Sequence, residues 1–385
     1  MLTLYDTRRR RVVPFRPRAK RASMYVCGVT PYDTTHLGHA RTFLVFDLIA
    51  RLLESRGIDL TYAQNVTDID ESILQRADRD GVDWRELGRR EERKFLQDMN
   101  ALGWRKPDVM PHATKELPAM LRLAGRLLAN GHAYRAEGGG LYYDAASFPR
   151  FGEICHLSAA KMRAINATQD DAALDAPKRR SPLDFALWRS VSSGPTWPSP
   201  YGRGRPGWHL ECSAMSERYL TLPIDIHGGG TDLVYPHHEC ETAQSEAARG
   251  GPFVRHWVHA APVRLDGEKM SKSLGNMIFV RDALRTTTPQ ALRLYLFDLQ
   301  YRRAFDHDEA RLDRARDRAE RLAGALGRGP ARLGADAATR AVLAALDADL
   351  DSPRAIRLLE RAARDSAAAT RPSLRYIARR ILGVA

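Results

Sequence analysis

Long hydrophobic runs are absent from this sequence of 385 residues. No apolar stretch approaches the about 20 residues that a membrane-spanning helix needs, so we expect no transmembrane segment. The first 20 residues are rich in arginine, but they contain Asp6 and have neither an apolar core nor the serine enrichment of a transit peptide. We therefore interpret this start as part of the mature protein.

Cysteine is scarce, because the chain has only Cys27, Cys155, Cys212 and Cys240. Four cysteines spread this widely are too few for a disulfide scaffold in a chain of this length. We therefore expect free thiols and a reducing, cytoplasmic location. No internal repeat of fixed period is visible either, which argues against a solenoid.

Acidic residues are outnumbered, since 60 lysines and arginines against 47 aspartates and glutamates give a net charge of +13. Such a balance favours a polyanionic partner, because clustered basic side chains release counterions from phosphates. A general bias toward arginine would give the same number, so the charge alone leaves nucleic-acid binding open. With 44% hydrophobic residues, the chain can bury large cores and divide into two or three domains.

The N-terminal part has the pattern of a nucleotide-binding α/β fold. Residues 24–29 form a β-prone run, residues 42–53 carry apolar side chains at helical spacing, and residues 60–66 predict the next strand. A doubly wound sheet binds its ligands beyond the carboxyl ends of its strands. We therefore expect the polar cluster 65–68 to lie at the same edge as His36 and His39.

The middle of the chain predicts a mixed insertion into this sheet. Residues 81–130 look mainly helical and residues 140–144 look like a strand, whereas the polar segment 158–182 is interpreted as a loop. The sheet resumes around residues 224–227 and 257–264.

Helix formers dominate after residue 301. Leu312, Ala315, Ala319, Leu322 and Leu326 define one apolar helix face. Ser352-Pro353 supplies an N-cap and a first-turn proline for a later helix, whose inward residues are Ile356, Leu359 and Ala363. We predict a catalytic domain over residues 1–300, with the insertion at about 90–205, and a helical bundle over 301–385.

Two short motifs carry the chemistry. His36-Leu37-Gly38-His39 is weak evidence by itself, since a His-x-x-His pair is often structural. Here it follows a strand and opens a helix, whose N-terminus attracts phosphate, and Gly38 permits close approach of a ligand. His36 and His39 are therefore predicted to stabilise charge that develops on phosphates.

The second motif is Lys269-Met270-Ser271-Lys272-Ser273, which lies in a polar, glycine-flanked loop. A solvated basic loop is the structural alternative. The ammonium groups of Lys269 and Lys272 are point charges that suit a leaving pyrophosphate. Together the two motifs indicate an ATP-driven adenylation enzyme.

The pair HLGH and KMSKS resembles the signatures of class I aminoacyl-tRNA synthetases. Residues 207–216 (GWHLECSAMS) and 225–230 (DIHGGG) look like the cysteinyl branch, and also like the related cysteine ligase of mycothiol biosynthesis. The similarity extends from about Leu4 to about Leu382. It implies an α/β fold: a class I synthetase Rossmann-like (HUP-type) parallel-sheet catalytic domain with an inserted connective subdomain and a C-terminal α-helical bundle.

The resemblance implies one Zn²⁺ ion that holds the substrate thiol. The matching ligand positions are Cys27, Cys212, His237 and Glu241. Spacing supports the last two, since residues four apart share one side of a helix, and two thiolates with an imidazole suit zinc. The local competitors are His238, Glu239 and Cys240, and Cys155 is interpreted as a structural thiol or a bystander. Because a hydroxyl is a poor partner for this soft ion, zinc would select cysteine over serine without editing.

The same resemblance implies the remaining substrate contacts. The predicted adenylate-binding residues are Gly28, Thr30, Thr42, Asn65, Thr67, Trp208, Gly230, Thr231, Asp232 and Val258. Trp208 is the one for which a core position is a serious alternative. The implied mechanism has two steps: the carboxylate of L-cysteine attacks the α-phosphate of Mg²⁺-bound ATP, and an acceptor then takes the cysteinyl group.

The acceptor is the open question. Glu241, the tripeptide 39–41 (HAR), the tripeptide 107–109 (PDV), the run 266–269 (DGEK) and the positive charge favour tRNA-Cys. Pro31, where synthetases usually have valine, and the absence of an anticodon-binding segment after Ala385 favour the amine of glucosaminyl-inositol. We expect tRNA-Cys. A non-catalytic paralogue that binds RNA is a third hypothesis, which the intact catalytic positions disfavour.

Overall fold

The computed structural model describes residues 1–385 except 34, 170–171, 271–274 and 366–370. Its centre is a parallel sheet that, in the described chain, has the order β10-β9-β3-β4. The strands are β3 (Arg21–Val29), β4 (Asp59–Val66), β9 (Ile226–Gly230) and β10 (Trp257–Ala260). The predicted strands at 24–29 and 60–66 are confirmed, and the parallel sheet confirms the predicted fold class.

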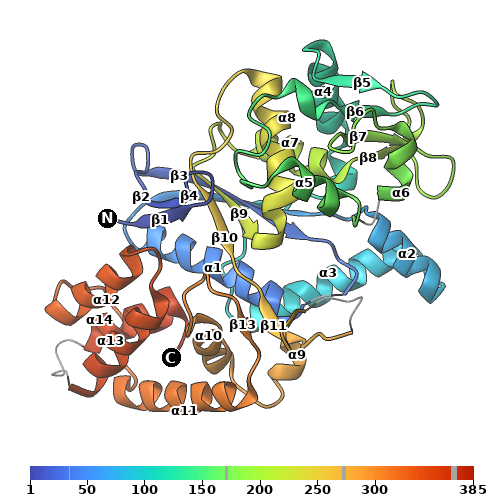
Figure 1. Ribbon diagram of the computed structural model, residues 1–385. Coiled ribbons are helices and arrows are strands. Elements are labelled where there is room, and N and C mark those ends of the chain that lie inside the picture. Colours follow the sequence, from blue (N-terminus) through green and yellow to red (C-terminus); the bar gives the residue numbers. More distant parts are fainter. Residues whose placement is uncertain (34, 170–171, 271–274, 366–370) are drawn as a thin grey trace.

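Side-chain alternation along β3 separates two cores. Met24 and Val26 face one core, together with helix α1 (Leu37–Glu54) and the C-terminal helices. Tyr25 and Cys27 face the other core, under α7 (Trp208–Tyr219) and α8 (Glu239–Arg249). Because successive strand residues point to opposite faces, β3 places Cys27 on the side of α7 and α8. Figure 1 shows α1 on one side of the sheet and α7 with α8 on the other.

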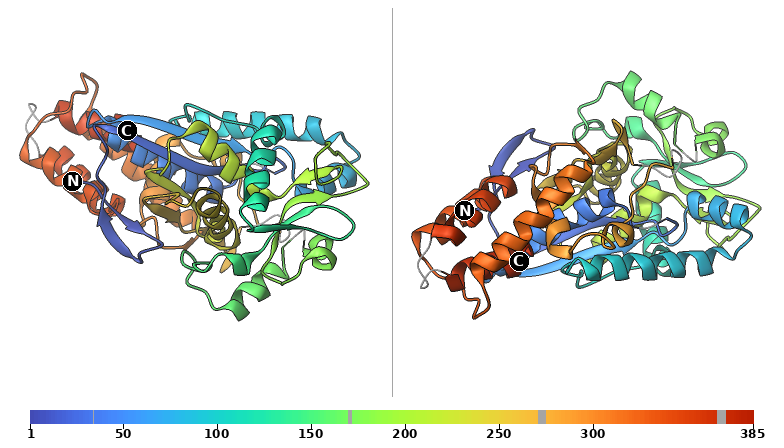
Figure 2. Two further views of the ribbon diagram at one scale, coloured as in Figure 1. Left: turned by 90° about the horizontal axis from the view of Figure 1, so that it is seen from above. Right: turned by 90° about the horizontal axis from the view of Figure 1, so that it is seen from below.

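The predicted mixed insertion is present above this sheet. Its antiparallel strands are β5 (Ala133–Arg135), β6 (Leu141–Tyr143), β7 (Phe185–Ser190) and β8 (Gly204–Pro206). The helices that lead into it are α2 (Glu71–Asp80), α3 (Trp84–Ala101) and α4 (Leu117–Ala129). Figure 2 shows the four antiparallel strands in a lobe apart from the C-terminal helices.

The interpretation of residues 158–182 as a loop was wrong. This segment contains α5 (Ala159–Asn166) and the short α6 (Ala172–Asp175). Ser158 caps α5 by accepting from the Lys161 N–H at 3.3 Å, and Met162 of α5 is buried. Asp175 at the end of α6 is buried in an ion pair with Arg189, Oδ1 to Nε 2.8 Å. These tertiary contacts stabilise helices that have little apolar periodicity of their own.

The strand predicted at residues 257–264 is interrupted. β10 ends at Ala260, and β11 (Val263–Leu265) belongs to a separate small sheet with β12 (Glu268–Lys269) and β13 (Phe305–Asp306). Pro262 lies between the two strands and has no N–H to donate to a ladder. The N-terminal hairpin consists of β1 (Thr3–Asp6) and β2 (Arg11–Pro14).

The C-terminal helices pack on α1. They are α9 (Val280–Ala283), α10 (Pro289–Phe297), α11 (Glu309–Leu326), α12 (Ala337–Asp347), α13 (Ser352–Asp365) and α14 (Arg371–Tyr376), followed by a π-helical turn, Ile377–Leu382. All the side chains predicted to face inward from α11 and α13 are buried. Ser352 is not the N-cap, since its hydroxyl donates to the Phe297 carbonyl, and Asp351 accepts from the Arg354 N–H instead.

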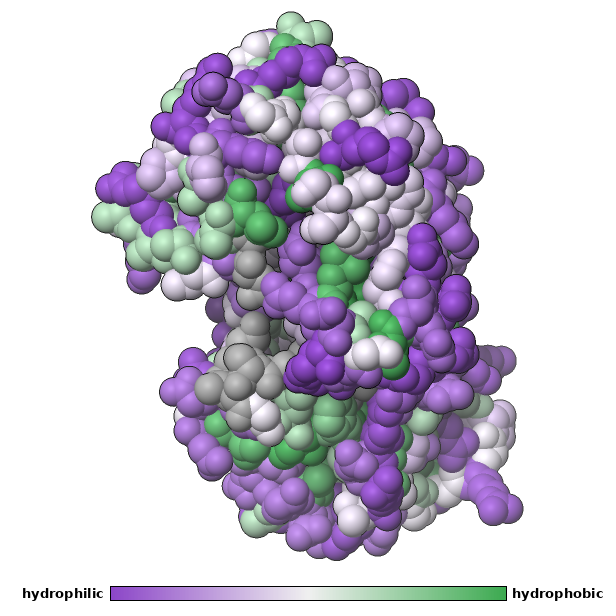
Figure 3. All heavy atoms as spheres, turned by 90° about the vertical axis from the view of Figure 1, so that its right-hand side faces the viewer, coloured by the Kyte–Doolittle hydropathy of each residue, from purple (hydrophilic) through white to green (hydrophobic). Residues whose placement is uncertain are grey.

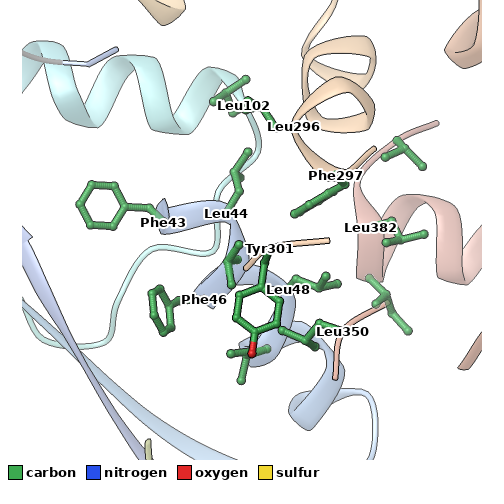
Figure 4. Close-up of a cluster of buried hydrophobic side chains, with 14 of the residues drawn as sticks. Phe43, Leu44, Phe46, Leu48, Leu102, Leu296, Phe297, Tyr301, Leu350 and Leu382 are labelled. Atoms are coloured by element: carbon green, nitrogen blue, oxygen red, sulfur yellow. The ribbon is translucent and has the colours of Figure 1, made fainter. Parts of the chain in front are cut away.

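Figure 4 shows the cluster that joins α1 to this part of the chain, in which Leu44 and Leu48 lie together with Phe297, Leu350 and Leu382. Both chain ends lie on this side of the molecule (Figures 1 and 2). Among the helices of the described chain, none has the length and apolar character to cross a membrane.

Candidate active site and metal centre

The N-terminus of α1 positions the first signature at the carboxyl end of β3. His36 is the N-cap, and its Nδ1 accepts from the Gly38 N–H at 3.1 Å and from the His39 N–H at 3.4 Å. The His36 and His39 rings stack with centroids 3.8 Å apart. Because Nδ1 accepts, the neutral His36 ring carries its proton on Nε2, which is then a donor. A Cβ at Gly38 would lie 2.9 Å from the His36 ring, so glycine is required for this cap.

A cleft of about 290 Å³ opens beside this helix end. Its lining includes His36 and His39 together with the following predicted residues: Cys27, Gly28, Thr30, Thr42, Trp208, Gly230 and Asp232. The polar cluster 65–68, predicted to lie at the same edge as His36 and His39, does not line this cleft, although it begins at the carboxyl end of β4, next to the carboxyl end of β3. Figure 3 shows the surface hollowed between an upper and a lower lobe.

Sequence reasoning missed further lining residues. These are Tyr32, Phe43, Leu233, Ala260, Pro262 and Val263, whereas Gly38 and Met270, which also line the cleft, belong to the two motifs singled out from the sequence. Ala260 ends β10, so the rule that ligands bind beyond parallel strand ends was a signal for it. No comparable local signal exists for Pro262 and Val263, which arrive through the turn into β11.

Three of the predicted contact residues lie outside this lining, and a fourth lies between two members of it. Asn65 is buried, and its Oδ1 accepts from the Gly28 N–H at 2.9 Å while its Nδ2 donates to Thr67 Oγ1 at 3.0 Å. Val258 is buried inside β10, and Thr231 lies between Gly230 and Asp232. Asn65 and Thr67 thus support the Gly28 backbone, and direct contact of these four residues with substrate stays a prediction.

The four predicted metal ligands converge in one buried cluster, which reaches the cleft through Cys27. The ligand atoms of Cys27, Cys212, His237 and Glu241 all lie within 4.8 Å of one another, and all four residues are buried. Cys27 Sγ is 3.3 Å from Glu241 Oε1, and His237 Nε2 is 3.2 Å from the same oxygen. Counting the described residues, His237 Nε2 and Glu241 Oε2 make no hydrogen bond. Two thiols, an imidazole and a carboxylate around such unsatisfied atoms fit a zinc ion.

A second set overlaps with the first. Cys27 and Glu241 also meet the same distance limit with His227 and His238. His238 Nδ1 is 2.7 Å from His259 Nε2, so one of its ring nitrogens already has a partner. The set with two thiols is the one that suits a soft ion better. Sequence reasoning did not identify His227 as a possible ligand. This histidine lies beside Cys27 because β9 pairs with β3 in the register Tyr25↔His227.

Two of the three competing ligands face elsewhere. The Glu239 carboxylate accepts from the N–H groups of Gly152, Ile154 and Cys155 at 2.8–3.0 Å. Cys240 is buried but belongs to neither of these groups of possible metal ligands. Helix α8 therefore directs Glu241 toward the cluster and Glu239 and Cys240 away from it.

Burial sets the charge of the predicted ligands. It raises the pKa of the Cys27 thiol and of the Glu241 carboxyl, and it lowers the pKa of the His237 imidazole. All three therefore favour their neutral forms in the protein alone, whereas a bound cation stabilises thiolate and carboxylate. The Trp208 ring stacks on His237 with centroids 4.2 Å apart and also lines the cleft, so the indole lies beside the cluster as part of the pocket wall.

The second signature is described only in part. Lys269 ends β12, where its backbone pairs with Arg264 of β11, and Met270 is buried and lines the cleft. The Lys269 side chain and all of Lys272 lie outside the described residues. Their predicted contacts with pyrophosphate stay predictions.

Comparison with known families identifies this arrangement. The model of the tRNA synthetases class I (C) catalytic domain matches residues 14–317. The chain belongs to this family. The predicted relationship to cysteinyl-tRNA synthetases is thereby confirmed.

Individual relatives carry two different names. A cysteine–tRNA ligase of Solidesulfovibrio magneticus is 46% identical over 325 residues, which are 83% of this chain and 66% of the relative. An L-cysteine:1D-myo-inositol 2-amino-2-deoxy-alpha-D-glucopyranoside ligase of Frankia casuarinae is 47% identical over 360 residues, 92% of this chain and 76% of the relative. The chain thus spans about two thirds to three quarters of these relatives' lengths.

The fold itself recurs in a solved synthetase. Mycobacterium tuberculosis methionyl-tRNA synthetase in complex with methionyl-adenylate has a TM-score of 0.67 at 16% identity, covering 94% of this chain and 88% of its own. At that identity the match supports the class I fold alone.

One buried arginine ties the helix of the first signature to the turn that precedes the β11–β12 hairpin. Arg41 follows the HLGH motif on α1 and is 1% exposed. Its guanidinium donates to the carbonyls of Ala261 at 3.0 Å, Pro262 at 3.3 Å, Gln300 at 3.1 Å and Arg303 at 2.7 Å. The Ala261-Pro262 turn leads directly into the β11–β12 hairpin that ends at Lys269. Sequence reasoning noted Arg41 only as part of a tripeptide and gave it no such role.

Proposed function

We propose that this chain activates L-cysteine with ATP to cysteinyl-adenylate and transfers the cysteinyl group to tRNA-Cys. The observation that carries the proposal is the cluster of Cys27, Cys212, His237 and Glu241, because its member Cys27 lines the same cleft as His36 and His39. A site that combines phosphate-binding donors with two buried thiols suits an amino acid that carries both a carboxylate and a thiol.

In this proposal the bound Zn²⁺ ion holds the substrate thiolate, a bond that the hydroxyl of serine makes poorly. Trp208 covers the cluster and limits the space above it. A substrate carboxylate oxygen attacks the α-phosphorus of ATP, which enters with Mg²⁺, and pyrophosphate leaves. His36, His39 and the α1 N-terminus donate to the phosphates, while Lys269 and Lys272 neutralise the leaving pyrophosphate.

The first acceptor we propose is tRNA-Cys. Glu241 supports it, because the resemblance implies a carboxylate ligand here in synthetases and a non-ligand in the mycothiol ligase. The Glu241 carboxylate lies inside the cluster, 3.3 Å from Cys27 Sγ. The four cysteines are free thiols, which suits a reducing cytoplasm as the proposed location.

The second candidate acceptor is the amine of glucosaminyl-inositol. The observation that favours this acceptor is the similarity to the Frankia casuarinae ligase. That relative is 47% identical to this chain, and the match covers 76% of its length. Both candidates share the adenylation step and differ only in the nucleophile of the second step.

The deciding experiment offers both acceptors side by side. Purified protein with ATP and radiolabelled cysteine is given a tRNA-Cys transcript, glucosaminyl-inositol, or a tRNA-Ser transcript as the control. We expect acid-precipitable label with tRNA-Cys only. Label found only in a small-molecule amide would replace the first candidate by the second, and no product with either acceptor would contradict the proposed transfer.

A further inference from the structure

A second cavity adjoins the adenylation cleft. Its volume is also about 290 Å³. Thr30, Tyr32 and Trp208 line both cavities and form their common wall. No step of cysteine activation uses the second cavity, yet a molecule bound there lies one side-chain layer from the cleft that holds the activated carboxyl group.

The lining of this cavity is polar and holds no cation. The residues that line it, all within the described chain, are Thr30, Tyr32, Asp70, Glu71, Ser72, Thr168, Gln169 and Trp208. They provide hydroxyl groups, one amide, two carboxylates and an indole. Such a set exchanges hydrogen bonds with hydroxyls and packs an aromatic face against a ring, but it offers no lysine or arginine to a phosphate.

Several parts of the wall are held by other contacts. The Asp70 side chain caps α2 by accepting from the Ser72 N–H at 2.8 Å. Glu71 Oε1 accepts from Arg205 Nη2 at 2.5 Å, and both side chains are largely buried. Trp208 is fixed by its stacking on His237. The cavity is therefore preformed, and ordering its walls costs little of the binding free energy of a ligand.

We propose that this cavity binds the sugar ring that carries the acceptor nucleophile. This inference rests on the proposed function. The ring is either the 3′-terminal ribose of a tRNA or the amino-sugar of glucosaminyl-inositol, because both present several hydroxyls and a nucleophile on one ring. Its hydroxyl or amine attacks the carbonyl carbon of cysteinyl-adenylate, an ester or amide bond forms, the bond from that carbon to the phosphate oxygen breaks, and AMP leaves while the nucleophile's proton passes to water.

The test separates binding of this ring from activation of cysteine. The variants are Gln169→Ala and the double variant Thr168→Val/Gln169→Ala, because neither residue lines the adenylation cleft. Gln97→Ala, an exposed glutamine on α3, is the matched control. Cysteine-dependent pyrophosphate exchange measures activation, and single-turnover transfer from preformed cysteinyl-adenylate measures use of the acceptor.

We expect exchange within about twofold of wild type in all variants. Loss of one or two hydrogen bonds to the ring raises the acceptor KM about tenfold in the double variant, with tRNA-Cys or with glucosaminyl-inositol, whichever acceptor the wild type uses. An unchanged acceptor KM, or a parallel fall of exchange and transfer, would overturn the inference. Absence of exchange in the wild type would instead overturn the proposed function.

Discussion

Replacement of Arg41 by methionine tests the link between the helix of the first signature and the turn at Ala261 and Pro262. Methionine fills part of the same volume but donates no hydrogen bond. The Pro262 and Gln300 carbonyls keep the backbone N–H groups of Phe305 and Arg303 as donors, so in the described chain the Ala261 and Arg303 carbonyls are the two left unsatisfied. Each acceptor left unsatisfied costs about 1–3 kcal/mol. The gain that opposes this is relief from a buried charge, since burial lowers the pKa of Arg41 to about 10. We expect Arg41→Met to lower the free energy of unfolding by about 3–5 kcal/mol.

The functional effect follows from where two of these carbonyls lie. Ala261 and Pro262 belong to the turn between β10 and β11, and Pro262 lines the cleft. A misplacement of about 1 Å at a reacting site lowers rates about 10²-fold. We therefore expect the kcat of pyrophosphate exchange to fall about 10²-fold, with little change in the KM for cysteine, because the thiol site on β3, α7 and α8 makes no contact with Arg41.

The assays are urea unfolding followed by tryptophan fluorescence and exchange kinetics at a temperature where the variant is folded. Arg41→Lys is the graded control, since lysine keeps the charge but has three donors on one nitrogen and cannot match the fork of guanidinium. Its losses should lie between those of wild type and Arg41→Met. An Arg41→Met protein with unfolding free energy within about 1 kcal/mol of wild type and full exchange activity would refute the reasoning.

Three further predictions concern the metal, the sheet and pH. Cys212→Ser should lower the zinc content from about one ion per chain to well below half, whereas Cys240→Ser should keep it, as measured by plasma emission spectrometry after gel filtration; equal zinc in both would contradict the ligand set. Gly28→Ala should abolish soluble expression or lower Tm strongly, because the new Cβ would lie 1.7 Å from the Asn65 carbonyl oxygen; a wild-type melting curve would show that the strands part easily. The hydrogen bond that His112 Nε2 donates to the Glu92 carboxylate raises the pKa of half-buried His112, so its stabilisation is complete below the unfolded value of about 6.5 and is lost as pH rises through the folded pKa. His112→Asn should therefore lose more unfolding free energy at pH 5.5 than at pH 8.5, and an equal loss at both would count against the ion pair.

Local patterns predicted much of the sheet and the bundle. The run that ends at Val29 became β3, and the apolar period from Leu312 to Leu326 became the buried face of α11. These features depend on residues close in sequence, so propensity and periodicity suffice. Helix α5 was missed because its stability comes from contacts with distant segments, among them the burial of Met162.

The candidate site also contains residues that could be predicted from the sequence and residues that could not. The HLGH motif and the four ligands were found because whole motifs resemble a family. His227 and Arg41 were not, because their roles depend on pairing between segments about 200 residues apart: β9 with β3, and α1 with the turn at Ala261. No local spacing encodes such a contact. The cavity beside Trp208 likewise arises only when α2 and the segment after α5 meet.

Cysteine activation is the central claim, and exchange of labelled pyrophosphate into ATP without any acceptor tests it most directly. The protein is assayed with cysteine, with serine and with no amino acid, at equal concentrations and with zinc content measured in the same preparation. We predict exchange with cysteine only, because the cluster of Cys27, Cys212, His237 and Glu241 holds a thiol and disfavours a hydroxyl. Exchange with serine as fast as with cysteine, or exchange with neither, would contradict the account.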